Sequence, residues 1–164
     1  MVEVQLAAVR VDLQSKTPVV LLQERHGGRR TLPIFIGPSE ATAIAFALQG
    51  VTTPRPMTHD LIKDILGTVG GTAERIVVTE LRDATYYAEI HLTLGGRNYV
   101  ISSRPSDAIA IAVRTGSPLF VSDDLLDAEG VILEPDEEAE EPDADELVDE
   151  FREFIQGVRP EDFS

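Results

Sequence analysis

The sequence predicts an α+β fold in which a strand-strand-strand-helix unit occurs twice. Stretches of alternating apolar and polar residues, which are typical of half-buried strands, recur in both halves of the chain. Each set of three such stretches precedes an alanine-rich helix that begins Pro-Ser-acid, at Pro38 and at Pro105. A Gly-Gly-Arg turn stands one strand before each helix, at residues 27–29 and 95–97. We expect duplicated units that form a mixed or antiparallel sheet with buried Ala-rich helices.

The first unit is expected to contain three strands and one helix. Its strands are predicted at residues 2–13, 19–23 and 31–36. The alternation slips at Ala7-Ala8, which indicates a β-bulge in the first strand. Pro38 suits the first turn of the following helix, and Gly50 ends it.

The second unit follows a loop and an additional helix. Residues 51–57 form the loop, and Thr58 is placed to cap a helix over residues 59–69. The strands of the second unit are predicted at residues 73–82, 85–94 and 98–102, and its helix runs from Arg104 to near Gly116. We expect residues 118–121 to add an edge strand and residues 124–127 a short helical turn.

The two helix starts support a duplication. Residues 38–45 and 105–112 are identical at six of eight positions, and a seventh exchanges Glu for Asp. Alanine matches arise easily between helices, so the Pro-Ser-acid start in the same place after a Gly-Gly-Arg turn carries more weight. Both helices are apolar nearly all round, and we therefore expect them to be buried against each other or against a partner subunit.

The net charge of −15 is concentrated in the C-terminal quarter. Residues 1–122 carry a net charge of +1 with ten arginines, whereas residues 123–164 carry −16. A near-neutral body with arginines does not repel nucleic acid, and an acidic tail would compete with it for arginine-lined surfaces. We expect a domain over residues 1–133, a mobile acidic linker over 134–146, and an amphipathic helix with a tail over 147–164.

Several classes of function are excluded by what the sequence lacks. There is no cysteine for a disulfide, a thiolate nucleophile or a thiolate-held metal. No apolar run is long enough to span a membrane, and the N-terminus does not have the pattern of a signal peptide, so a cytoplasmic protein is expected. No Gly-x-x-x-x-Gly-Lys loop, dinucleotide fingerprint, Gly-x-Ser-x-Gly elbow or His-Glu-x-x-His helix is present. No aromatic-basic stripe indicates a base-stacking surface.

Three polar clusters carry chemistry that suits phosphodiester hydrolysis. They are Glu40, residues 55–60 and residues 104–107. Carboxylates bind Mg²⁺ or Mn²⁺, and such metals activate water and stabilise displacement at phosphorus. Arginine forks and helix N-termini both favour phosphate.

Structural roles compete with this interpretation. Glu40 and Asp107 fall at about the third position of their helices, where an acid stabilises the helix by roughly 0.3–1 kcal/mol. Asp60 stands near the start of its own helix, and the same role applies to it. His59 in that position is more commonly exposed or a cap than a ligand.

The same motifs resemble those of a known family. Residues 36–41, 55–61 and 103–110 are similar to segments of the bifunctional nuclease family of bacteria and plants, and residues 151–154 and 160–163 resemble its bacterial ending. The resemblance implies an α+β domain that tends to dimerise and that degrades both RNA and DNA.

We therefore predict a metal-assisted nuclease of low base specificity that acts on RNA and DNA as a homodimer. The predicted roles are Glu40 and Asp107 as ligands of Mg²⁺ or Mn²⁺, Asp60 or His59 as the water-activating base, and Arg55, Arg104, Ser106 and Thr58 as substrate-binding residues. The alternative is a non-enzymatic homodimeric module that binds a protein or a small ligand through the same polar patch.

Overall fold

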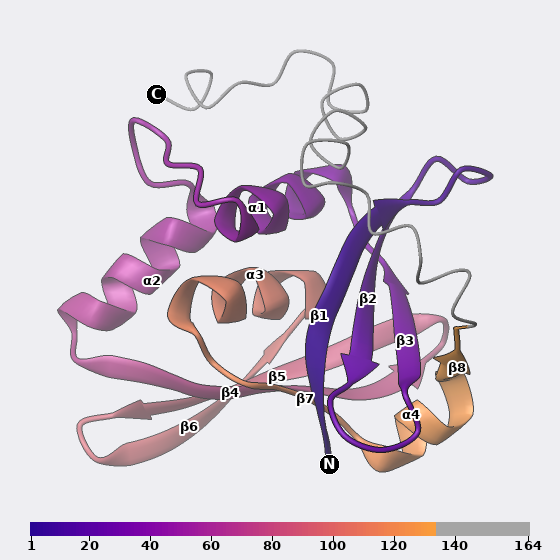
Figure 1. The fold of residues 1–164 in the computed structure, drawn as a ribbon. Helices are drawn as coiled ribbons and strands as arrows, with labels where there is room; N and C mark the ends of the chain where they lie inside the picture. The colour runs from indigo at the N-terminus through magenta and orange to yellow at the C-terminus, as the bar shows by residue number, and fades with distance from the viewer. Residues whose placement is uncertain (134–164) are drawn as a thin grey trace.

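The computed structural model describes residues 1–133, and these residues form one mixed eight-stranded sheet with four helices (Figure 1). The α+β prediction is confirmed. The strands are β1 (Val2–Val11), β2 (Pro18–Glu24), β3 (Arg30–Phe35), β4 (Gly71–Arg82), β5 (Thr85–Leu94), β6 (Arg97–Ser103), β7 (Leu119–Val121) and β8 (Val131–Ile132). The helices are α1 (Pro38–Leu48), α2 (Thr58–Thr68), α3 (Pro105–Thr115) and α4 (Asp123–Glu129).

The strand order shows two matching halves. It runs β6-β5-β4-β7-β1-β2-β3-β8, so an antiparallel meander extends outward on each side of β7. Because β7 pairs antiparallel with β1 and parallel with β4, these two first strands run in opposite directions. A pseudo-twofold axis near β7 requires this arrangement. Each meander leads into a helix that begins Pro-Ser-acid, in agreement with the duplicated unit that the sequence predicts.

The first strand contains the expected bulge. The register between β1 and β2 shifts between Leu6 and Ala8, and β4 shifts against β5 between Ala73 and Arg75. The first strand is shorter than predicted and ends at Val11. The reason is a local turn, in which the Asp12 carboxylate accepts a hydrogen bond of 2.7 Å from the Ser15 amide.

The prediction of an edge strand at residues 118–121 is wrong. This segment becomes β7, which lies between β1 and β4 and joins the two halves. Leu119 and Val121 are buried there. A run of three apolar residues is compatible with a short central strand as well as with an edge strand, so the local sequence could not distinguish the two positions. The outer neighbour of β3 is instead the two-residue β8, which the sequence pattern did not indicate.

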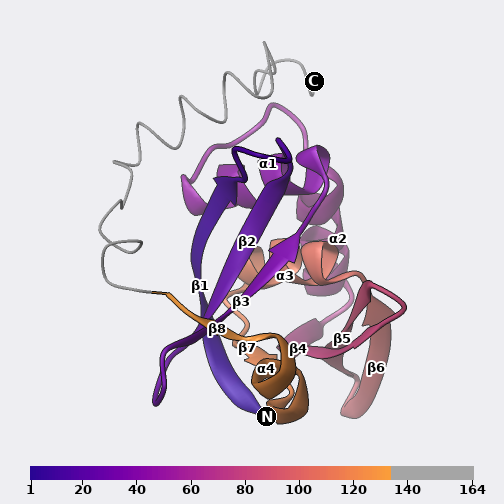
Figure 2. The same ribbon diagram turned by 90° about the vertical axis from the view of Figure 1, so that its right-hand side faces the viewer.

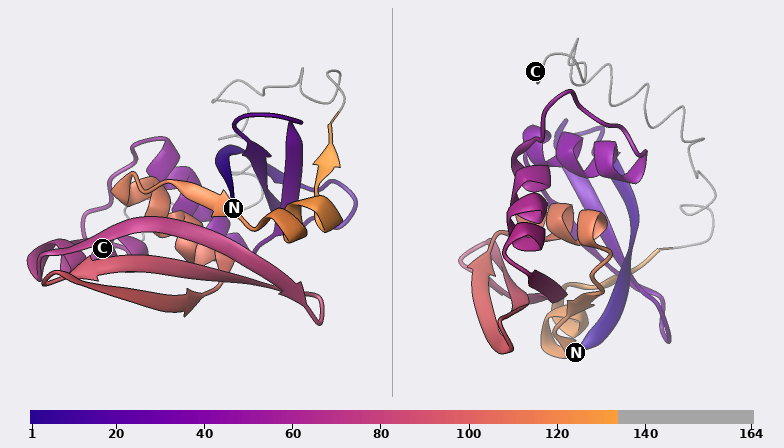
Figure 3. Two further views of the ribbon diagram at one scale, coloured as in Figure 1. Left: turned by 90° about the horizontal axis from the view of Figure 1, so that it is seen from below. Right: turned by 90° about the vertical axis from the view of Figure 1, so that its left-hand side faces the viewer.

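The helices differ in burial. The twisted sheet curls around α3, and α1 and α2 lie over the same side (Figures 2 and 3). Residues 108–112 of α3 are all buried, and α1 packs against α3. In α1 only residues 41–44 are buried, and Leu48 is 55% exposed, so α1 is less enclosed than its composition predicted.

No helix in residues 1–133 is long and apolar enough to cross a membrane. The predicted acidic linker at 134–146 and the predicted C-terminal helix lie outside the described residues.

Candidate active site

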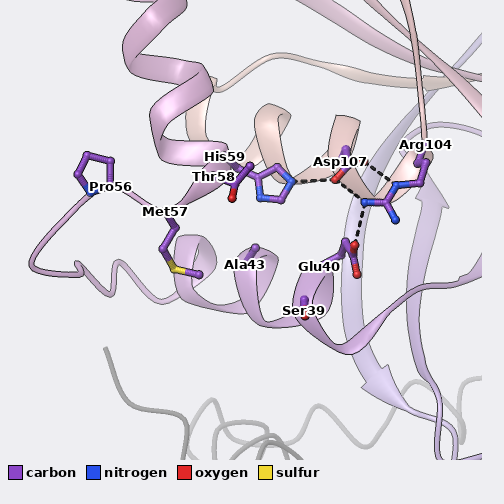
Figure 4. A pocket seen from close by; sticks show the side chains of 9 residues that line it. All are labelled: Ser39, Glu40, Ala43, Pro56, Met57, Thr58, His59, Arg104 and Asp107. Atoms are coloured by element: carbon purple, nitrogen blue, oxygen red, sulfur yellow. Dashed lines mark hydrogen bonds and ion pairs between the residues drawn. The ribbon is translucent and has the colours of Figure 1, made fainter. Parts of the chain in front are cut away.

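The first turns of three helices line one open pocket of about 610 Å³ (Figure 4). The lining residues are Ser39, Glu40, Ala43, Pro56, Met57, Thr58, His59, Arg104 and Asp107. The residues that precede α1 and α3, Gly37 and Arg104, have extended backbone and supply no side-chain cap. Helix N-termini carry partial positive charge and unpaired N–H groups, so their convergence favours an anion in this pocket.

Four charged or titratable side chains form a continuous polar chain along the pocket (Figure 4). Nε2 of His59 lies 2.9 Å from Oδ1 of Asp107. Arg104 donates from Nε to Oδ2 of Asp107 at 2.7 Å and from Nη2 to Oδ1 at 3.1 Å. The same Nη2 donates to Oε1 of Glu40 at 2.8 Å. The polar chain is therefore His59–Asp107–Arg104–Glu40, and it joins the starts of all three helices.

Exposure varies strongly along the polar chain. The His59 side chain is only 9% exposed, whereas Arg104 is 65% exposed. The expectation of an exposed His59 is wrong, because the start of α2 packs against α3 and places the imidazole beside Asp107. Arg104 is consequently the group most accessible to a ligand, and His59 lies deeper in the pocket.

Asp107 is ionised and orients the imidazole. Burial raises the pKa of Asp107, but hydrogen bonds from Arg104 and His59 outweigh burial and hold the pKa below its usual value. An ionised carboxylate can only accept, so His59 donates to it through Nε2. In the neutral imidazole that makes this bond, Nδ1 is the hydrogen-bond acceptor. Within residues 1–133 no hydrogen bond reaches Nδ1. The pair therefore has the arrangement of a general base with an orienting carboxylate.

Gly37 makes room for Glu40. A Cβ added at Gly37 would overlap the Glu40 carboxylate, which folds back over the start of α1. The φ of Gly37 is −73°, which any residue adopts, so a substitution there would move the Glu40 carboxylate without straining the backbone. The absence of a side chain at Gly37 lets Glu40, which is 17% exposed, reach Arg104.

Asp60 does not line the pocket and pairs instead with Arg114. The Arg114 side chain is 6% exposed and donates from Nε to Oδ1 of Asp60 at 2.6 Å. It also donates to the backbone carbonyls of Ala110 and Ala43, each at 2.9 Å. Arg114 thus ties α1, α2 and α3 together.

The Asp60 carboxylate has a second role at the start of α2, where it accepts a hydrogen bond of 3.1 Å from the Met57 amide. Burial raises the pKa of Asp60, but the bonds from Arg114 and Met57 outweigh it and lower the pKa. Asp60 therefore fits a structural role better than that of a base. Sequence reasoning missed Arg114, whose signal is that it is the single basic residue of α3 and stands in the last turn.

The remaining predicted substrate residues are dispersed. Thr58 lines the pocket, but it is the first residue of α2 and Met57 is its N-cap, so the capping prediction is wrong. Arg55 is exposed in the preceding loop, does not line the pocket, and makes no ion pair within the described part of the chain. Ser106 is buried, with 6% exposure, and lines a second pocket on the other side of Arg104.

The carboxylates converge on one point, but Arg104 occupies it. Glu40 and Asp107 both accept hydrogen bonds from the same Nη2 of Arg104. Among the described residues, no three His, Asp or Glu side chains are grouped to hold a metal ion. With the guanidinium between the two acids, a divalent cation would meet positive charge at short range. The residues as placed do not fit such an ion, and the Mg²⁺ or Mn²⁺ site stays a prediction.

The fold and the site define an α+β protein with an acid–base pair and an arginine in a pocket suited to an anion. A family model described as the bifunctional nuclease domain matches residues 20–134, and the chain belongs to this family. The match includes every member of the polar chain.

Relatives of two kinds resemble the chain. An uncharacterized protein of Mycobacterium tuberculosis is 42% identical over 163 residues, which cover 98% of this chain and 97% of that protein. Bifunctional nuclease 2 of Arabidopsis thaliana is 30% identical over 115 residues, and bifunctional nuclease 2 of Oryza sativa subsp. japonica is 27% identical over 117 residues. The matches cover 68% and 70% of this chain but only 35% and 36% of the plant proteins.

Proposed function

We propose that the chain is a cytoplasmic nuclease that hydrolyses phosphodiester bonds of RNA and DNA at the polar chain, with low base specificity. The observation that carries this proposal is the His59–Asp107 pair, which lines the same pocket as the exposed Arg104. The names of the plant relatives support the proposal.

Phosphate is the group that this pocket suits best. Arg104 is exposed and can turn part of its guanidinium from Glu40 to a phosphate oxygen. The three helix N-termini add donors and positive potential. Because every nucleotide carries the same phosphate, recognition through these groups gives low base specificity.

Hydrolysis then needs a base next to the bound phosphate. Nδ1 of His59 accepts a proton from water as the water oxygen attacks phosphorus, and Asp107 stabilises the imidazolium that results. The phosphorus–oxygen bond to the leaving nucleoside breaks, and that oxygen is protonated from solvent. Arg104 stabilises the negative charge that builds up on the phosphoryl oxygens.

A contaminant-controlled assay tests the proposal. Parent, Asp107→Asn and Glu40→Gln proteins are purified identically and given single-stranded RNA and DNA, with Mg²⁺, with Mn²⁺ and with a chelator. Loss of cleavage in an Asp107→Asn protein that is still folded at the assay temperature supports the assignment. Equal cleavage by all three proteins would place the activity elsewhere or in a contaminant. The chelator arm decides separately whether the predicted metal is required.

One feature favours a binding module as the second candidate. Both pocket carboxylates accept hydrogen bonds from Arg104, so the charged groups of the polar chain are paired with one another. Such a site can bind an anion without catalysis. Nucleic-acid or phosphate binding by Arg104 in a protein that never cleaves would assign the pocket to a non-enzymatic module.

A further inference from the structure

A second pocket, of about 330 Å³, lies against the first and shares Arg104 with it. It is formed by the end of β3, the turn between β4 and β5, and the start of α3. Its lining residues are Thr17, Ile34, Phe35, Ile36, Gly37, Ala84, Thr85, Tyr86, Arg104, Pro105 and Ser106. The volume is at the lower end of the range for small-molecule sites.

The chemistry of this second pocket differs from that of the first. Arg104 is the only charged residue in its lining, and the rest is apolar, aromatic or hydroxyl-bearing. Phe35 lines it with a side chain that is 59% exposed. Burial, followed by the nearby negative charge of Glu129, raises the pKa of Tyr86, so its hydroxyl stays protonated as a donor. A flat group with apolar faces and polar edges suits this lining.

We propose that the second pocket holds the nucleoside next to the phosphate bound at Arg104, with its base stacked on Phe35. This inference rests on the proposed function, because it takes Arg104 as the phosphate-binding group. The substrate is then single-stranded, since a base within a duplex is paired and stacked and cannot enter a side pocket. The absence of an aromatic-basic stripe in the sequence does not bear on this pocket, because Phe35 and Tyr86 come from different halves of the chain.

Binding measurements on the full chain test the proposal without depending on cleavage. The probes are a labelled phosphorothioate oligodeoxynucleotide and the same chain with every base removed. Stacking of one base on an aromatic ring contributes about 1–3 kcal/mol, so the parent should bind the first probe about tenfold more tightly than the second. Phe35→Ala should remove that difference, and Phe35→Trp should keep it.

Two further variants make the outcomes distinguishable. Tyr99→Ala removes another exposed aromatic, on β6 and outside both pockets, and should preserve the tenfold difference. Arg104→Ala should weaken both probes. If Phe35→Ala retains the difference, or if a duplex binds more tightly than a single strand, the proposal of a nucleoside pocket is wrong. Weaker binding of both probes by Arg104→Ala would still support the phosphate site. If Arg104→Ala changes neither probe, the proposed function itself fails.

Discussion

Arg104 holds the centre of the site because its guanidinium reaches two acids from different helices. It pairs with Glu40 on α1 and with Asp107 three residues along its own chain. The hydrogen bonds that Arg104 donates to Asp107 and then to Glu40 raise the pKa of Arg104, so it stays charged at any working pH. If Arg104 binds phosphate as proposed, each acid competes with phosphate for the same donors, and the strength of these pairs sets the affinity.

Gly37→Ala tests this competition. The added methyl group displaces the Glu40 carboxylate from its place over α1, while the backbone angles stay allowed. We expect inorganic phosphate to bind severalfold more tightly to Gly37→Ala, and Glu40→Gln should act in the same direction. Calorimetric titration measures both. Unchanged phosphate affinity in the two variants would show that Glu40 does not compete at Arg104.

Asp107 makes the stability depend on pH in a defined direction. Its pKa in the folded protein lies below the ordinary 3.8, so its pairs stabilise the fold at neutral pH and are lost as pH falls through that lowered value. The difference in unfolding free energy between the parent and Asp107→Asn should be largest near pH 7 and shrink below about pH 4. Urea unfolding at pH 7 and pH 3 measures it. The exposed Asp64→Asn is the control, and an equal difference at both pH values would contradict the account.

At the scale of elements, the site depends on how three helix starts are held together. Arg114 pairs with Asp60 of α2, the residue that follows His59 in the sequence. It also donates to backbone carbonyls of α1 and α3. The geometry between His59 and Asp107 is thus supported by a buried guanidinium.

Arg114→Met tests this support. Methionine fills the space but leaves the Asp60 carboxylate without its partner and removes one hydrogen bond from each of two buried carbonyls. Loss of such partners costs about 1–3 kcal/mol. Asp60 is 37% exposed, so solvent offsets part of the loss. We expect a lower melting temperature and slower cleavage, whereas Arg82→Met, at an exposed position, should change neither. If the Arg114→Met protein were fully active and as stable as the parent, Arg114 would not support the site in this way.

The sequence predicts those parts of the fold that depend on local patterns. The bulge near Ala7, the Pro-Ser-acid helix starts and the repeated meander follow from alternation, proline and glycine. The central position of β7 and the burial of His59 depend on which elements meet after folding, and no local pattern specifies this. The candidate acids Glu40 and Asp107 do meet. That the Arg104 guanidinium lies between them, and that Arg114 joins the three helices, could be seen only in the three-dimensional structure.

At the scale of the whole molecule, two apolar surfaces remain uncovered within residues 1–133. Leu61 and Ile65 on α2 and Val69 at its C-cap form an exposed stripe, each between 50% and 54% exposed. On β6, an edge strand of the sheet in the described part of the chain, Tyr99, Val100 and Ile101 are 43–57% exposed. Apolar groups on an edge strand are typical of a surface that pairs with another chain.

A homodimer remains a prediction, and these surfaces now provide its reason, since α1 and α3 pack on each other. Light scattering at micromolar concentration should give twice the chain mass. Ile101→Lys on β6 should lower that mass, whereas Leu13→Lys, at a 75% exposed position between β1 and β2, should not. A monomer in the parent protein would reject the prediction.

The proposed role of His59 as the general base of phosphodiester hydrolysis is best tested by comparison with a second histidine. The chain contains a matched control in His91, which also pairs with an acid, Glu89, but lies on β5 outside the pocket. Single-turnover cleavage of one RNA and one DNA strand is measured for the parent, His59→Gln and His91→Gln. Removal of a general base lowers rates by about 10²–10⁴, so we predict that loss for His59→Gln and parental rates for His91→Gln. Equal rates for His59→Gln and the parent, in folded protein, would contradict the account.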